Sequence, residues 1–150
     1  MQRCIMETTE NPCRILIVDD QESMRLLLAH YVSQELHVEI DVAGTCEEAL
    51  HLAEQKTYDA ILLDLLMPGI GGFEVLKSIR ADSANKTTPV IVVSILVTSL
   101  ASEGEIGHDH AIELGVDAFV SKPVAYNTLI ETVKAALAKA QLREVVIVRK

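Results

Sequence analysis

Five polar side chains suited to metal or phosphoryl chemistry stand at the ends of short apolar runs. They are Asp19, Asp20, Asp64, Ser94 and Lys122. A short apolar run bounded by turn residues is typical of a strand buried on both faces of a parallel sheet. The carboxyl ends of parallel strands meet at one edge, where ligands bind in open α/β sheets. The five side chains are therefore predicted to lie at that edge.

Three carboxylates at one edge would repel one another and raise their pKa values unless a cation lies among them. Carboxylates, a backbone carbonyl and water are the ligands that Mg²⁺ prefers, and Mg²⁺ commonly handles phosphate. Ser94 adds a hydroxyl, and Lys122 adds a fixed positive charge. A carboxylate nucleophile with these groups around it is suited to receiving and holding a phosphoryl group.

The apolar runs alternate with stretches of helical periodicity. Strands are predicted over 14–20, 37–42, 58–63, 90–94 and 118–120. Helices are predicted over 21–35, 72–81 and 127–141, and a further helix is predicted to begin at the capping box 45–48. Such alternation indicates βαβ units and a parallel sheet with helices on both faces. Five units fit an α/β, flavodoxin-like doubly wound fold with strand order 2-1-3-4-5. Its switch point lies between the strands that end in Asp19-Asp20 and in Asp64.

The 150 residues are predicted to form one domain over 14–142. Residues 1–13 are interpreted as a flexible leader, and 143–150 as a C-terminal tail. The apolar run Val145 to Val148 is expected to be an extra strand, which would pair with a sheet edge or with a second copy of the chain in a homodimer. The stretch 95–107 is a long insertion without clear periodicity.

Composition excludes several classes of protein. A net charge of −9 argues against direct nucleic-acid binding, because phosphate contacts need Lys and Arg. No apolar run has the length of a membrane span, and the N-terminus has no signal-peptide pattern. Three cysteines, odd in number and without ligand spacing, favour free thiols in a reducing cytosol. A cytoplasmic location is expected.

From about Arg14 to Leu142 the chain resembles a response-regulator receiver domain of bacterial two-component signalling, the CheY-like family. Each matching motif is weak alone, but together they occur in order, most of them at strand ends. They are Asp19-Asp20, the LLDLLMPG segment around Asp64, Gly72-Phe73-Glu74, the strand from Pro89 to Ser94 and Lys122-Pro123.

The resemblance implies that Asp64 is the phosphoacceptor, which takes a phosphoryl group from a histidine kinase or a histidine phosphotransfer protein. It also implies that Mg²⁺ is bound directly by Asp20, Asp64 and the Leu66 carbonyl, with Asp19 acting mostly through water. The domain would be a signalling module and not a metabolic enzyme, and it would control an output protein or domain that the sequence does not identify.

By the same resemblance, Ser94 and Lys122 would hold the phosphoryl oxygens. Ser94 and Phe119 would form the conformational switch, and the Lys122–Pro123 bond would be cis. Two features depart from the family. Ser94 and Lys122 are 28 residues apart, several more than usual, which Thr98 in place of Ser94 would correct. Ile95 stands where the family has a small residue.

Other interpretations compete with this one. Asp19 and Asp20 could simply cap the helix that follows, Lys122 could be a solvated surface residue, and Phe119 could be plain core. As a whole, the chain could be a degenerate receiver that acts as a phosphorylation-independent interaction module. An aspartate-nucleophile phosphohydrolase is disfavoured, because such enzymes place a second Asp where this chain has Leu66.

Overall fold

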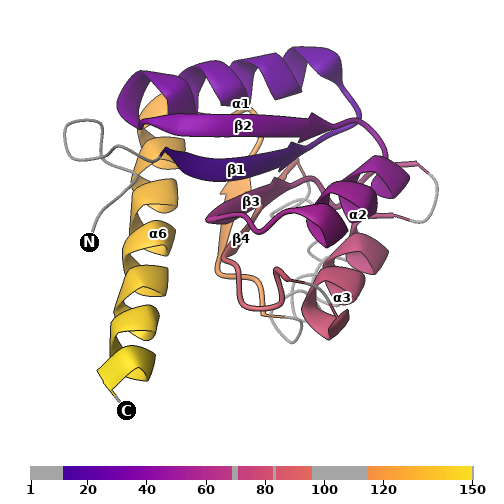
Figure 1. The fold of residues 1–150 in the computed structure, drawn as a ribbon. Coiled ribbons are helices and arrows are strands. Elements are labelled where there is room, and N and C mark those ends of the chain that lie inside the picture. Colours follow the sequence, from indigo (N-terminus) through magenta and orange to yellow (C-terminus); the bar gives the residue numbers. More distant parts are fainter. Residues whose placement is uncertain (1–11, 69–70, 83, 96–114, 150) are drawn as a thin grey trace, which may run out of the picture.

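The computed structural model describes residues 12–68, 71–82, 84–95 and 115–149. A five-stranded parallel sheet forms the centre of the molecule, with strand order β2-β1-β3-β4-β5 (Figure 1). The strands are β1 (Cys13–Val18), β2 (Val38–Ala43), β3 (Ala60–Leu63), β4 (Val90–Ser94) and β5 (Ala118–Ser121). The predicted α/β, flavodoxin-like fold and its strand order are confirmed.

Helices cover both faces of the sheet. The described helices are α1 (Glu22–Glu35), α2 (Cys46–Gln55), α3 (Gly72–Asp82) and α6 (Tyr126–Arg149). Helices α1 and α6 cover one face, and α2 and α3 cover the other (Figure 1). Alternate side chains of β1 belong to opposite faces: Ile15 and Ile17 pack with α1 and α6, whereas Leu16 and Val18 pack with α2 and α3. Both sets are buried, which explains why the strand is apolar throughout instead of alternating.

The pairing register brings the strand ends together at one edge. Val18 of β1 lies beside Leu63 of β3, and the Asp64 amide continues this ladder by donating to the Val18 carbonyl at 3.0 Å. Ser94 of β4 lies beside Ser121 of β5, and the Lys122 amide donates to the Ser94 carbonyl at 3.2 Å. We call this the carboxyl edge.

The C-terminal tail differs from the prediction. Val145 to Val148 belong to helix α6, so the expected extra strand is wrong. A four-residue apolar run has no period that separates strand from helix, and no Gly or Pro between Tyr126 and Arg149 ends the helix before it. At the other end, β1 begins at Cys13, one residue inside the predicted leader.

The cysteines also differ in part. Cys46 is a buried free thiol, as expected, but Cys13 is disulfide-bonded. Cysteine count and spacing do not show which residues a fold brings close, so the expectation of free thiols is wrong for Cys13. The insertion beyond Ile95, including Thr98, lies outside the described residues, as does most of the leader.

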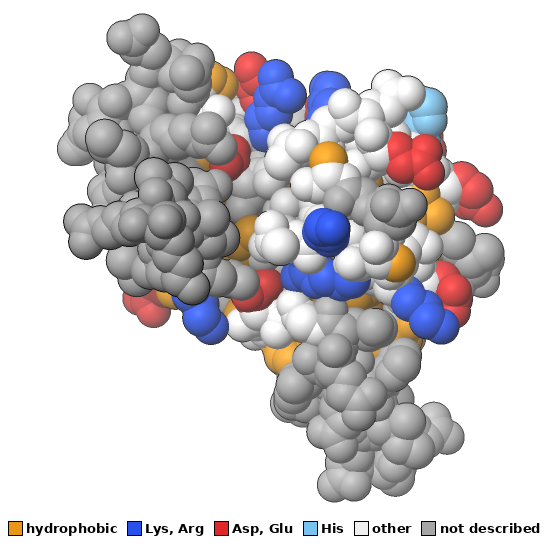
Figure 2. Space-filling model, turned by 60° about the horizontal axis from the view of Figure 1, so that its bottom comes forward, with side chains coloured by type: hydrophobic (Ala, Val, Ile, Leu, Met, Phe, Trp, Pro, Cys, Tyr) orange, Lys and Arg blue, Asp and Glu red, His pale blue; other side chains and the backbone are white. Residues whose placement is uncertain are grey.

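None of the helices described is long and apolar enough to cross a membrane. On the face shown in Figure 2, acidic and basic side chains of the described residues are interspersed, with hydrophobic ones scattered between them.

Candidate functional site

Three carboxylates converge at the carboxyl edge. Asp19 and Asp20 follow β1, Asp64 follows β3, and one oxygen from each lies within 4.8 Å of the others. Asp19 and Asp64 are buried, whereas Asp20 is exposed. The predicted grouping of these three residues is thus present in the structure, and it opens to solvent on the Asp20 side.

Lys122 enters this cluster from the end of β5. Its ammonium donates to Asp19 Oδ2 at 2.7 Å and to Asp64 Oδ2 at 3.2 Å. The Lys122 side chain is 10% exposed, against 1% for Asp19 and 6% for Asp64. Lys122 is therefore a partly buried partner of two carboxylates, and the interpretation as a solvated lysine does not hold.

The electrostatics of the cluster are unbalanced. Burial raises the pKa of the Asp64 carboxyl, and the Leu66 amide and the Lys122 ammonium oppose that shift without cancelling it. Burial alone would lower the pKa of Lys122, but the hydrogen bonds and charges of Asp19 and Asp64 outweigh it, so that pKa is raised. One cation does not compensate three carboxylates, which leaves the cluster favourable for a further cation.

Both oxygens of Asp64 are held. Oδ2 faces Lys122, and Oδ1 accepts a hydrogen bond from the Leu66 amide at 2.9 Å. Asp19 is held in a similar way, because its Oδ1 accepts from the Gln21 amide at 2.9 Å at the start of α1. This is an Asx-type turn and not a helix cap, because Gln21 is the N-cap residue of α1 and makes no side-chain cap hydrogen bond. The other oxygen of Asp19 is directed to Lys122.

A glycine fixes the loop after the acceptor. A Cβ on Gly72 would come within 2.4 Å of the Leu65 Cα and 2.6 Å of the Asp64 carbonyl oxygen, so only glycine fits against this backbone. Gly71 beside it has φ +87°, which glycine tolerates best. The sequence analysis used Gly72 only as part of a motif. Its signal was a glycine where a helix begins, in place of a usual capping residue.

Ser94 and Phe119 lie on neighbouring strands. Ser94 ends β4 and is 2% exposed, and Phe119 in β5 is paired with Val92 in register. Phe119 is half-buried against the core cluster beneath α2 and α3. The Lys122–Pro123 peptide bond is cis, as the resemblance implied.

Comparison with known proteins gives the family. The profile of the response regulator receiver domain matches residues 15–134. The chain belongs to the response-regulator receiver-domain family.

Relatives and solved structures agree with this assignment. The transcriptional regulatory protein ResD of Bacillus subtilis is 36% identical over 130 residues, which cover 87% of this chain and 50% of ResD. The chain therefore spans about half the length of this curated relative. The chemotaxis response regulator CheY4 of Vibrio cholerae superposes with a TM-score of 0.72 at 27% identity, covering 83% of this chain and 98% of the CheY4 chain.

A more distant structure shares the fold. The receiver domain of the sensor histidine kinase PA1611 from Pseudomonas aeruginosa has a TM-score of 0.73 at 21% identity, and the match covers 84% of the present chain and 98% of the PA1611 domain. That structure is described with a magnesium ion coordinated in its active site cleft.

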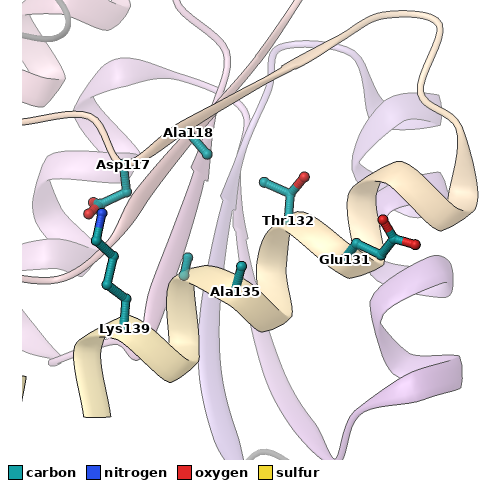
Figure 3. A pocket seen from close by; sticks show the side chains of 7 residues that line it. Asp117, Ala118, Glu131, Thr132, Ala135 and Lys139 are labelled. Atoms are coloured by element: carbon teal, nitrogen blue, oxygen red, sulfur yellow. The ribbon is translucent and has the colours of Figure 1, made fainter. Parts of the chain in front are cut away.

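The acidic cluster of the receiver has the donor set of a hard-cation site. Its three side chains offer only carboxylate oxygens, which suit Mg²⁺ or Ca²⁺ and not the softer metals that select thiolate or imidazole. A separate pocket of about 450 Å³ lies between β5 and α6, where Figure 3 shows Lys139 reaching toward Asp117. None of the candidate site residues lines it, so the site is the acidic cluster and not this pocket.

Proposed function

We propose that the receiver accepts a phosphoryl group on Asp64, with Mg²⁺ as cofactor, from a histidine kinase or a histidine phosphotransfer protein. The observation that carries this proposal is the buried Asp64 carboxylate, held at Oδ1 by the Leu66 amide and at Oδ2 by Lys122. A carboxylate fixed in this way is positioned to attack a phosphorus atom in line.

The acidic cluster fits Mg²⁺. Asp20 and Asp64 would be direct ligands together with the Leu66 carbonyl, and Asp19 would act through water. When bound, the cation would supply positive charge against the phosphoryl oxygens. Burial raises the pKa of Asp64, and the Leu66 amide and the Lys122 ammonium do not cancel that shift. A further cation at the cluster would favour the ionised carboxylate, which supports this assignment.

Lys122 and Ser94 would hold the transferred group. Attack by an Asp64 oxygen on the donor's phosphorus forms the aspartyl phosphate and breaks the donor's phosphorus–nitrogen bond. The Lys122 ammonium, now 3.2 Å from Asp64 Oδ2, would then pair with a phosphoryl oxygen, and the Ser94 hydroxyl would donate to another. Movement of Ser94 toward that group would allow Phe119 on the next strand to change its packing.

A phosphorylation-independent interaction module is the alternative. A domain that only binds partners would not need a cation held between two buried acids, yet Lys122 is paired with both Asp19 and Asp64. We therefore favour the acceptor function. The output partner is a further protein or domain, consistent with relatives about twice as long. We also propose that the domain lies in the cytoplasm and contacts neither nucleic acid nor membrane directly. If it forms a homodimer, the contact is not the predicted strand of the tail, because that segment belongs to α6.

The test is uptake of a phosphoryl group from acetyl phosphate, measured by intact mass with and without Mg²⁺. The wild-type chain should gain one phosphoryl group only when Mg²⁺ is present, and Asp64→Asn should gain none. Uptake by Asp64→Asn would refute Asp64 as the acceptor. Absence of uptake by a folded wild-type chain that binds Mg²⁺ would favour the interaction module.

A further inference from the structure

Arg25 on α1 contacts the acid-bearing turn from outside the cluster. Its Nη1 donates to the Asp19 carbonyl oxygen at 2.8 Å. That carbonyl belongs to the peptide unit that joins Asp19 to Asp20, and a peptide unit is rigid and planar. The guanidinium therefore fixes the orientation of this peptide plane. Because the Asp20 nitrogen and Cα belong to the same plane, the contact also helps to position the Asp20 carboxylate.

The contact completes the fixing of Asp19. Its amide donates to the Ala43 carbonyl at 3.1 Å, its Oδ1 accepts from Gln21 and its Oδ2 accepts from Lys122. With Arg25 on the carbonyl, every polar atom of Asp19 has a partner. Asp20 is exposed, so its position depends on the peptide plane that precedes it.

Gly44 provides the space for this arginine. A Cβ on Gly44 would come within 2.8 Å of Arg25 Nη1 and 3.3 Å of Arg25 Cζ, the same guanidinium that contacts Asp19. The nearest atoms to that Cβ all belong to Arg25, the end of a flexible side chain. An alanine at this position would thus move the guanidinium and leave the surrounding backbone in place.

We propose that Arg25 is a positioning residue for the Mg²⁺ site: it orients the peptide between Asp19 and Asp20 from a space that Gly44 keeps open. This inference rests on the proposed function. It requires Mg²⁺ affinity to depend on Arg25 although Arg25 is not a ligand. Groups that orient metal ligands commonly change affinity by about 10–100-fold when they are removed.

The test is the Mg²⁺ dissociation constant of the full chain, measured by calorimetric titration. Arg25→Gln should raise it by about tenfold, the lower end of that range, because Arg25 acts through the backbone. Arg25→Lys keeps one charged donor and should recover part of the affinity. Gly44→Ala should weaken binding like Arg25→Gln, and the double variant should be no worse than Arg25→Gln alone.

Arg14→Gln is the matched control. Arg14 lies at the start of β1, at the opposite end of the strand, with its Nε 3.6 Å from Glu39. Arg14→Gln removes the same charge as Arg25→Gln, but far from the acidic turn. Because charges beyond a Debye length are screened, the Mg²⁺ dissociation constant should stay within about twofold of the wild-type value. Equal weakening by Arg14→Gln and Arg25→Gln would overturn the proposal, because net charge would then explain the effect.

A second readout needs no metal. The Gln21 amide donates a hydrogen bond to Asp19 Oδ1. In the absence of Mg²⁺, its hydrogen exchange should be faster in Arg25→Gln than in the wild type. If Arg25→Gln does not fold, Gly44→Ala and Arg25→Lys carry the test. A wild-type chain that binds no Mg²⁺ would refute the proposed function. If the wild type, Arg25→Gln and Gly44→Ala all bind Mg²⁺ with the same dissociation constant, this inference is refuted and the proposed function is not.

Discussion

The two edges of the sheet both bury polar groups, but they treat charge differently. At the amino edge, where the strands begin, Asn85 and Arg80 connect loops through hydrogen bonds to neighbouring backbone atoms. At the carboxyl edge, three carboxylates surround Lys122. The first edge is saturated with partners, whereas the second has an excess of negative charge.

The amino edge is organised around Asn85. This fully buried side chain donates to the Ala53 and Lys56 carbonyls, both at 2.8 Å, and accepts from the Tyr58 amide at 2.7 Å and from Thr88 Oγ1 at 3.0 Å. It uses both donors and its acceptor oxygen, so it joins the end of α2 to the starts of β3 and β4.

Arg80 does the same for the next loops. Its guanidinium donates to the Thr88 and Gly115 carbonyls, each at 2.7 Å, and lies 3.5 Å from Asp117. Arg80 thus has one opposite charge and several carbonyls as partners, and Asp117 also accepts from the Val90 amide at 2.9 Å. The comparison teaches that buried polarity with complete pairing stabilises a fold, whereas buried polarity with unbalanced charge indicates a site for a ligand.

The largest expected effect is at the amino edge. Asn85→Ala leaves the Tyr58 amide and two carbonyls buried without this partner, each costing about 1–3 kcal/mol, so we expect a loss of about 3–5 kcal/mol in the free energy of unfolding. Urea denaturation measures it. Thr87→Ala, at an exposed position of the same loop, should change stability by less than about 0.5 kcal/mol.

Phosphoryl uptake per folded Asn85→Ala molecule should equal that of the wild type, because Asn85 lies at the opposite edge from Asp64. If Asn85→Ala kept the stability of the wild type but lost phosphoryl uptake, the two edges would not have separate roles, because the amino edge would then take part in phosphorylation.

The second effect removes the cation of the carboxyl edge. Lys122→Met leaves two buried carboxylates without their partner and should cost about 3 kcal/mol near neutral pH, the lower end of the range for such a loss, because Lys122 is only partly buried. The raised pKa of Lys122 means that its contribution is complete below the usual value of 10.5 and is lost as pH rises through the raised one. The deficit should shrink in acid, because the Asp64 carboxyl, whose pKa burial raises, then protonates. Mg²⁺ should restore part of the lost stability.

Thermal unfolding across a pH series with and without Mg²⁺ measures this. Lys86→Met, an exposed lysine of the amino edge, is the charge-matched control and should show neither the pH dependence nor the Mg²⁺ response. A Lys122→Met deficit that stayed constant down to acid pH would show that lost packing, not charge, is the cause.

These edges also differ in how far sequence predicts them. Asp19, Asp64, Ser94 and Lys122 were predictable because each follows an apolar strand, and parallel strands end at one edge. The Asn85 contacts were not, because Ala53, Lys56 and Tyr58 are 27 to 32 residues away and Asn85 itself lies in a loop without a period.

The contacts of Arg25 and Gly72 were hidden for a related reason. The Arg25 contact depends on the missing Cβ of Gly44, and the Gly72 contact depends on a close approach to the backbone of Asp64 and Leu65. Spacing in the sequence indicates neither distance. The α6 tail was mispredicted because four apolar residues fit a strand and a helix equally. Periodicity predicts layers and strand ends, whereas side-chain contacts between loops need coordinates.

The third prediction concerns the sign of a single charge. Because the pKa of Asp64 is raised, its ionised form destabilises the folded chain above that raised pKa, and the penalty disappears as pH falls toward the usual value of 3.8. Asp64→Asn should therefore be more stable at neutral pH, by about 1 kcal/mol, with the gain vanishing in acid.

Asp41→Asn is the control of opposite sign. Burial would raise the pKa of Asp41, but hydrogen bonds from Tyr58 and Lys56 outweigh it and the pKa is lowered. Its charge stabilises the fold above pH 3.8 and that contribution is lost as pH falls, so Asp41→Asn should be less stable at neutral pH. Denaturant midpoints across pH measure both, and equal signs would show that Asp64 carries no uncompensated charge.

The smallest effect concerns the lifetime of the proposed phosphoryl group. An aspartyl phosphate is hydrolysed when water attacks in line, and polar side chains orient that water. Leu66 follows the acceptor by two residues and is 44% exposed, yet its apolar side chain cannot hold a water. Leu96, the other apolar residue expected beside this path, lies outside the described residues. We therefore expect slow loss of the phosphoryl group.

Leu66→Asn should shorten the lifetime by about 3–10-fold, which is a change of about 1 kcal/mol in the barrier. The decay is followed by intact mass after removal of the phosphodonor. Leu26→Asn is the control, because Leu26 is also an exposed leucine, 65% accessible, but it lies on α1 and not on the acceptor loop. Equal lifetimes for wild type and Leu66→Asn would mean that water reaches the phosphorus by a route that this side chain does not border.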